Sequence, residues 1–153
     1  MTQKELTALA HQIATAAHGT TTRNDKKTLY ITHPRAVAKI ALEIARTYFP
    51  DWTEDQLYQL EQVAILHDVV EDTSVTLKDL IDYGFSDLVI KSVAAITKHP
   101  VKGAESYLDY LKRVYAYQYS RISKLADLSH NMSDLKPGNM LDKYVLAQEY
   151  LKY

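Results

Sequence analysis

The feature that most constrains the fold of this chain is a group of ionisable side chains directly after an apolar helical stripe. The segment 51–66 repeats apolar residues at helical spacing, so one face of this helix should point into a core. That face consists of Leu57, Leu60, Val63 and Ala64. His67 continues the same face and Asp68 is its neighbour. A buried imidazole and carboxylate are costly unless they are compensated, usually by a bound metal ion.

Two further acidic residues follow within the next turn. Glu71 and Asp72 lie four residues after His67 and Asp68, respectively, so each falls beside its partner if the helix continues. A carboxylate in such a place can order a water molecule or transfer a proton. The segment therefore predicts a site that holds a metal ion and moves protons beside it.

A single His-Asp pair is weak support, because chance alone gives about half of one such pair in a chain of this composition. Two other segments offer further ligands. His33 lies one turn before the apolar stripe Val37, Ile40, Ala41, Ile44 and Tyr48, with Pro34 suited to the first position of that helix. Asp127 shares a polar helical face with Lys124 and Asn131, and the packed face there should be Ile122, Leu125, Ser129 and Met132.

The candidate ligands are two histidines and two aspartates: His33, His67, Asp68 and Asp127. Such a mixed nitrogen and oxygen set suits Mn, Fe, Co, Ni or Zn better than calcium. It lacks the thiolates of a structural zinc site, and the chain has no cysteine at all. The expected metal is therefore catalytic rather than structural.

At the level of motifs, the chain resembles the HD-domain metal-dependent phosphohydrolases, which carry an H…HD…D pattern. The resemblance is closer to the hydrolase half of the RelA/SpoT enzymes and to the free-standing small alarmone hydrolases. It covers most of the chain, in the family's order. The matching segments are Tyr30–Pro34, His67–Thr73, Thr97–Lys98 and Lys124–Met132.

This resemblance implies that the chain hydrolyses guanosine 3′,5′-bis(diphosphate) to GDP and pyrophosphate, with one Mn²⁺ or another divalent transition metal per chain. By position, the metal ligands would be His33, His67, Asp68 and Asp127. Glu71 and Asp72 would be the catalytic acid–base pair. The expected contacts to the nucleotide substrate are Arg23, Lys26, Lys124 and Asn131.

Three departures from the family leave other readings open. Leu128-Ser129 stands where the family has Arg-Leu, Lys27-Thr28-Leu29 replaces its Gly-x-Pro, and the loop of residues 19–27 is one residue longer. The substrate could therefore be an adenine alarmone, the 2′-phosphate of NADPH or a nucleoside monophosphate. A non-catalytic nucleotide-binding module is the second alternative.

The fold that we expect is all-α: a single HD-domain bundle of about eight helices over residues 1–153. Only four glycines and four prolines interrupt the chain, and no run alternates apolar and polar residues. The helices should span 2–18, 34–49, 54–70, 77–83, 86–98, 104–120, 121–134 and 140–152, with capping at Thr53, Thr76 and Asn139.

Charge and hydropathy restrict the partners. The net charge of −1 argues against a general nucleic-acid surface, and a small anionic nucleotide needs only a local basic pocket. No apolar run approaches the roughly 18 residues of a membrane span, and the first residues lack the apolar stretch of a signal peptide. We therefore expect a cytoplasmic protein without nucleic-acid or membrane partners; the oligomeric state is left open.

Overall fold

A computed structural model describes residues 1–153 and confirms the all-α class. The helices are α1 (Gln3–His18), α2 (Thr32–Tyr48), α3 (Glu54–Leu66), α4 (Val69–Asp72), α5 (Leu77–Tyr83), α6 (Asp87–Ile96), α7 (Tyr107–Tyr115), α8 (Gln118–Met132) and α9 (Asn139–Leu151). No strand forms, and the only β-type pairing is an isolated bridge between Thr22 and Leu29 within the loop that joins α1 to α2. None of the helices has both the length and the apolar character needed to span a membrane.

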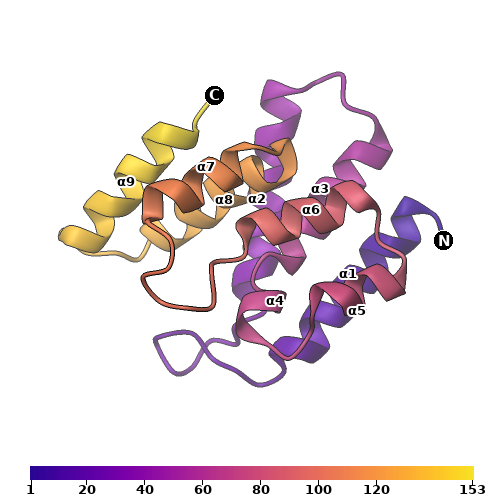
Figure 1. Ribbon diagram of the computed structural model, residues 1–153, viewed down its shortest axis with the longest axis horizontal. Helices are drawn as coiled ribbons and strands as arrows, with labels where there is room; N and C mark the ends of the chain where they lie inside the picture. Colours follow the sequence, from indigo (N-terminus) through magenta and orange to yellow (C-terminus); the bar gives the residue numbers. More distant parts are fainter.

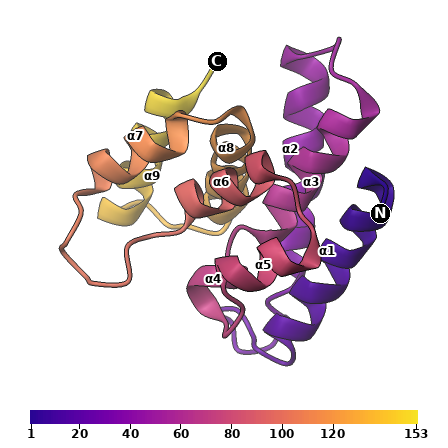
Figure 2. The same ribbon diagram turned by 45° about the vertical axis from the view of Figure 1, so that its right-hand side comes forward.

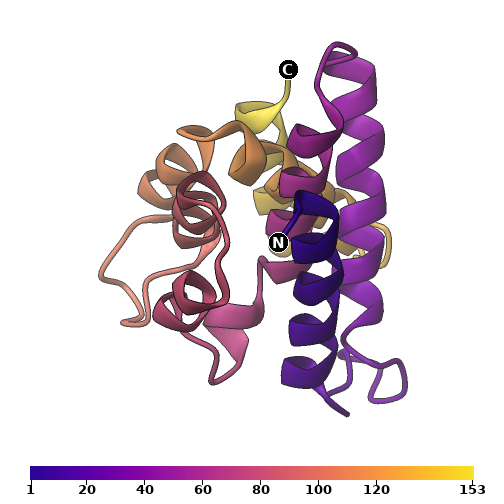
Figure 3. The ribbon, with the colours of Figure 1, turned by 90° about the vertical axis from the view of Figure 1, so that its right-hand side faces the viewer.

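Helices α3 and α8 occupy the middle of the molecule. α3 packs against α1, α2, α6 and α8, and α8 packs in addition against α2, α6, α7 and α9. α1 lies at one side of the bundle and α9 at the opposite side (Figure 1). In Figure 3, α1 and α2 both run along one long side of the molecule. The ligand-bearing segments thus belong to the best-packed part of the fold.

The apolar interior consists of two clusters that meet at α8. The larger lies among α1, α2, α3, α6 and α8, and includes Val37, Leu60, Val63 and Ile122. The smaller joins α7 and α9 to α8 and the end of α6 (Figure 2). Burial of this apolar surface is the main force that holds the helices together. It also fixes the helices that carry the candidate ligands.

The predicted helix 54–70 is wrong at its C-terminal end, where the chain bends. α3 ends at Leu66 and the short α4 begins at Val69, with Asp68 at φ −104° and ψ −5° between them. The Nδ1 atom of His67 lies 2.7 Å from the backbone oxygen of Ala64, the carbonyl three residues earlier. A side chain that bonds to a helical carbonyl competes with the backbone, which favours a helix end here.

Other expected boundaries also shift. α7 and α8 separate at Ala116–Tyr117 and not at residue 120, because Ser120 lies in the first turn of α8 and its hydroxyl donates to the Val114 oxygen. Pro34 is the third and not the first residue of α2, a place that proline tolerates because first-turn N–H groups have no helical partner. Capping boxes at Thr53 and Thr76 are confirmed.

The remaining differences concern single residues. Gly138 and not Asn139 occupies the cap position of α9. Tyr48 and Ser129, which we expected on packed faces, are exposed. Leu128 is buried in place of Ser129, and the polar pair Lys124 and Asp127 is buried as well. Ile122 and Leu125 of the expected apolar face are buried too, so the middle of α8 is enclosed on both faces, and the charged one builds the site.

Candidate active site and metal centre

The four predicted ligands converge from three parts of the bundle. His33 lies in the first turn of α2, His67 and Asp68 form the junction of α3 and α4, and Asp127 lies in α8. One ligand atom from each lies within 4.8 Å of all the others. His33 Nε2 is 2.7 Å and His67 Nε2 is 3.2 Å from Asp127 Oδ1, and His67 Nε2 is 2.9 Å from Asp68 Oδ2. The structure thus gathers side chains that are up to 94 residues apart in sequence.

The chemistry of these atoms fits a divalent metal ion. Two imidazole nitrogens and two carboxylate oxygens face one another, and three of the four residues are buried. Carboxylate oxygens and unprotonated imidazole nitrogens can only accept hydrogen bonds. Such atoms can lie this close together only with a proton or a cation between them. The group can therefore hold a divalent metal in an interior where bare carboxylates would be costly.

Neighbouring atoms orient both histidines. The Nδ1 atom of His67 can donate to the Ala64 oxygen at 2.7 Å, which leaves Nε2 free to face the carboxylates. The Nδ1 atom of His33 lies 2.7 Å from Nδ1 of His130. The hydroxyl of Tyr30 donates to Asp68 Oδ2. Contacts of this kind fix the tautomer and direction of metal-binding side chains.

Electrostatics distinguishes the two histidines when no metal is bound. Burial lowers the pKa of His33, which keeps that ring neutral. Burial would also lower the pKa of His67, but Asp68 and Asp127 together raise it well above its ordinary value. Burial alone would raise the pKa of Asp127. Lys124 and the two histidines lower it by more, so the pKa of this carboxyl stays well below its usual range. A metal ion would thus replace a proton on His67.

The acidic pair lies on α4, directly beside the ligands. Asp68, Glu71 and Asp72 place carboxylate oxygens within 4.8 Å of one another. Glu71 Oε1 accepts the backbone N–H of Lys98 at 2.8 Å. Partial desolvation of this still exposed side chain, followed by the charges of Asp68 and Glu71, raises the pKa of Asp72 to about 6. A carboxyl that titrates near neutral pH is well suited to acid–base catalysis.

Three of the four predicted substrate contacts lie on the same side of the cluster. Lys124 Nζ donates to Asp127 Oδ2 at 2.8 Å, and Asn131 Nδ2 donates to Asp127 Oδ1 at 3.2 Å. Asn131 in turn accepts from Arg23 Nη2 at 3.3 Å. A hydrogen-bonded chain therefore runs from Asp127 to the loop before α2. Lys26, the fourth, is exposed and belongs to none of the cavity walls described below.

Two cavities meet at this cluster. The smaller, of about 140 Å³, is lined by His67, Asp68, Glu71, Asp72, Asp127 and Lys124, among others. The larger, of about 800 Å³, lies between the loop before α2 and the end of α8, and Arg23 lines it. Tyr30, Asn131 and Tyr144 line both. Together the cavities offer a small polar chamber beside the ligands and a wider space for the rest of a ligand.

Several side chains of this site escaped the sequence interpretation as functional groups. Tyr30 lies within a matching motif, but nothing in the pattern of residues indicated its bond to Asp68. His130 also lies within a matching motif, and its ring contacts that of His33. Tyr110 and Tyr144 come from helices without any motif, and both line the smaller cavity. Only their position in the fold brings these two to the site.

Comparison with known proteins agrees with this geometry. The HD domain family model matches residues 30–150, the part of the chain that contains all four candidate ligands. The chain belongs to the HD-domain family. This membership confirms the interpretation drawn from the H…HD…D pattern.

Two individual relatives bear names that describe a particular activity and not only the family. The guanosine-3′,5′-bis(diphosphate) 3′-pyrophosphohydrolase MESH1 of Xenopus tropicalis is 32% identical over 150 residues, which are 94% of this chain and 78% of that protein. The bifunctional (p)ppGpp synthase/hydrolase SpoT of Escherichia coli is 31% identical over 138 residues, 82% of this chain. The match covers only 17% of SpoT.

A solved structure shares the fold. It is described as a metazoan ortholog of SpoT that hydrolyses ppGpp, and it superposes with a TM-score of 0.68 at 21% sequence identity. The match covers 95% of this chain and 83% of that one. The two chains therefore share the helical arrangement around the site.

Proposed function

We propose that this protein is a metal-dependent 3′-pyrophosphohydrolase that cleaves guanosine 3′,5′-bis(diphosphate) to GDP and pyrophosphate. The observation that carries the proposal is the convergence of two histidines and two aspartates beside a second acidic pair; all of these residues except His33 line one polar cavity. Relatives at 31% and 32% identity bear the name of this activity. The proposed metal ligands are His33, His67, Asp68 and Asp127, and the proposed metal is one Mn²⁺ per chain.

In the proposed reaction, water attacks the phosphorus atom bonded to the 3′ oxygen of the ribose. The bond between that phosphorus and the 3′ oxygen breaks, and the leaving oxygen takes up a proton from the acidic pair Glu71 and Asp72. A divalent ion at the four ligands would supply Lewis acidity, which lowers the pKa of water and neutralises developing charge. Asp72 takes the proton from water, since its pKa of about 6 leaves it mostly ionised at neutral pH.

The other residues hold the substrate and the acid–base pair. Glu71 is fixed by the Lys98 N–H, which keeps α4 beside the segment that follows α6. Lys124 carries positive charge into the cavity next to Asp127. Arg23 and Asn131 line the wider cavity, where the base and the 5′ end of a nucleotide would lie. Lys26, on the same loop, would attract the anionic ligand from the exposed edge.

The decisive experiment is product analysis after incubation with Mn²⁺. Guanosine 3′,5′-bis(diphosphate) should yield GDP and pyrophosphate in equal amounts, without any need for ATP. Release of orthophosphate instead of pyrophosphate would contradict the proposal and favour another phosphohydrolase reaction. A parallel panel should contain the adenine analogue, NADPH and nucleoside monophosphates, because Leu128 replaces an arginine of the family.

Binding without turnover of any compound in the panel would instead support the non-catalytic module. The intact acidic pair argues against that outcome, because a module that only binds nucleotides does not require a carboxyl that titrates near neutral pH. A cytoplasmic location, and the expectation that neither nucleic acids nor membranes are partners, stay predictions.

A further inference from the structure

Two tyrosine rings of α7 are surrounded by three lysines from other parts of the chain. The rings of Tyr107 and Tyr110 lie 5.9 Å apart between centroids and are tilted by 31°. Lys143 Nζ, from α9, lies 4.0 Å from the centroid of Tyr107. Lys124 Nζ, from α8, and Lys98 Nζ, which follows α6, lie 5.4 and 5.9 Å from the centroid of Tyr110. Four segments of the fold thus bring three ammonium groups around one pair of rings.

The positive charge in this group is only partly balanced. Lys124 forms an ion pair with Asp127, but neither Lys98 nor Lys143 forms one. Burial, together with the charges of Lys98 and Lys124, lowers the pKa of Lys143. Aromatic faces attract ammonium groups, typically by about 0.5–2 kcal/mol, and this attraction does not neutralise them. Lys98 and Lys143 are therefore available to an anionic ligand, because no carboxylate forms an ion pair with either of them.

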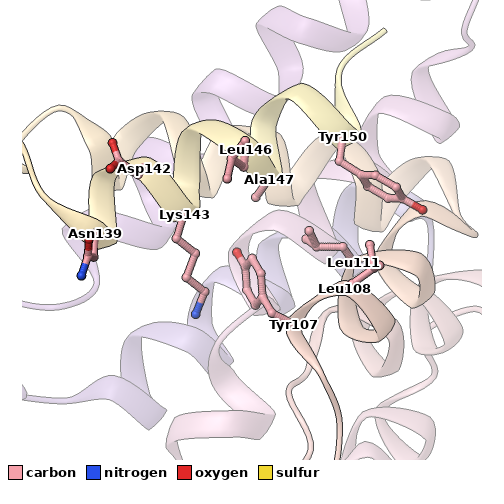
Figure 4. A pocket seen from close by; sticks show the side chains of 9 residues that line it. All are labelled: Tyr107, Leu108, Leu111, Asn139, Asp142, Lys143, Leu146, Ala147 and Tyr150. Carbon is pink, nitrogen blue, oxygen red and sulfur yellow. The ribbon is translucent and has the colours of Figure 1, made fainter.

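The group borders the active site from the side of α9. Lys98, Lys124 and Tyr110 line the smaller cavity beside the proposed ligands, as does Tyr144, the neighbour of Lys143. Lys143 and Tyr107 line a third cavity, of about 440 Å³, between α7 and α9. Figure 4 shows the side chain of Lys143 extending from α9 beside the Tyr107 ring, away from Leu146 and Tyr150.

Tyr107 supplies a second sign of a missing ligand. Its hydroxyl oxygen is buried and has no hydrogen-bond partner in the protein. Buried hydroxyl groups are normally satisfied, so an unpaired hydroxyl on the ring that Lys143 contacts requires a reason. A phosphate oxygen would accept its hydrogen bond and would also pair with the ammonium groups.

We propose that Lys143 is a phosphate-binding residue which, together with Lys98 and Lys124, binds the pyrophosphoryl group of the substrate and the pyrophosphate product. The ring of Tyr107 positions the Lys143 ammonium for this contact. Neither the motifs nor the metal cluster points to α9. The inference rests on the proposed function only in its choice of anion, since pyrophosphate is the product of that reaction.

The test is binding of inorganic pyrophosphate to the Mn-loaded protein, measured by calorimetry. Lys143→Gln should weaken pyrophosphate binding by about tenfold, the loss of one ionic contact worth about 1.4 kcal/mol. Lys143→Arg should keep most of the affinity. Lys112→Gln is the matched control, because it removes the same charge from an exposed residue of α7. An equal loss in Lys143→Gln and Lys112→Gln, or no loss in either, would overturn the inference.

Measuring turnover together with pyrophosphate binding distinguishes a failure of this inference from a failure of the proposed function. If the parent releases pyrophosphate from the guanosine substrate while Lys143→Gln binds pyrophosphate as tightly as the parent, the function stands and the lysine site is refuted. If the parent cleaves no guanosine substrate but loses pyrophosphate affinity on Lys143→Gln, the lysine site stands and the reaction is refuted. A parent that neither cleaves the substrate nor binds pyrophosphate would refute both.

Discussion

The Nδ1 atoms of His33 and His130 lie 2.7 Å apart, so one of the two rings donates a hydrogen bond to the other. If a metal ion binds His33 Nε2, the proton of the neutral ring must be on its Nδ1, and His130 is then the acceptor. His130 thereby orients the His33 ring from its Nδ1 side, whereas Asp127 lies at the Nε2 side.

His130→Ala should therefore weaken metal binding, by roughly 10- to 100-fold as for other partners of metal ligands. The His33 ring would lose its hydrogen-bond acceptor and could turn away from the site. Titration of the metal-free protein with Mn²⁺ gives the affinity. His99→Ala, which removes an exposed histidine from a turn, is the control. Equal affinities in the parent and both variants would show that His130 has no such role.

Asp127→Asn should abolish metal binding and also lower stability. Lys124 is buried and donates to this carboxylate, so the substitution leaves an ammonium group without a counter-charge, at a typical cost of about 3–5 kcal/mol. Elemental analysis and denaturant unfolding measure the two effects. The double variant Lys124→Met/Asp127→Asn should recover stability but not the metal. Unchanged metal content in Asp127→Asn would exclude this ligand set.

Glu71→Gln and Asp72→Asn should leave metal content near one per chain and reduce turnover. Loss of an acid–base group costs roughly 10²–10⁴-fold in rate, and neither residue is a proposed ligand. For the parent, kcat/KM should fall at acid pH as Asp72 becomes protonated; its pKa is about 6 without a metal, and a cation bound beside Asp68 would move this limb to lower pH. That limb should vanish in Asp72→Asn. Turnover within a few-fold of the parent in both variants would make these residues ordinary surface charges.

Asp72→Asn should also stabilise the metal-free protein at neutral pH. The pKa of Asp72 is raised to about 6 in the folded state, chiefly by burial, whereas an unfolded aspartate titrates near its ordinary value. The unfolded chain therefore loses this proton first, and stability falls as the pH rises from about 4 to 6. Melting temperatures of both proteins should nearly coincide at pH 4, diverge as the pH rises to 6 and stay apart above it, with the variant higher.

Arg23→Ala should raise KM more than it lowers kcat, because Arg23 lines the wide cavity and not the chamber with the acidic pair. Lys26→Ala should have a weaker effect, since Lys26 lies at the exposed edge of the loop. Steady-state kinetics on the guanosine substrate measures both. A fall in kcat at constant KM would place Arg23 in the chemical step.

The sequence predicted the ligand-bearing helices well because their apolar stripes have a clear period. It failed where tertiary contacts decide the backbone: the bond of His67 to the Ala64 oxygen ends α3 at a place where helical periodicity continues. It also assigned Asp127 to a polar face without indicating that this face is buried. Lys143 could not be identified, since no pattern within α9 reveals that its neighbours are lysines of α8 and of the segment after α6.

The wide separation of the ligands along the chain has a consequence for folding. His33, the pair His67–Asp68 and Asp127 come together only when α2, α3 and α8 are all in place, so an unfolded chain presents no comparable site. A metal ion bound there would add directly to the resistance to unfolding, by about 2.7 kcal/mol when the free ion is at 100 times its dissociation constant. The concentration of the available metal would therefore determine both the turnover rate of this protein and its resistance to unfolding.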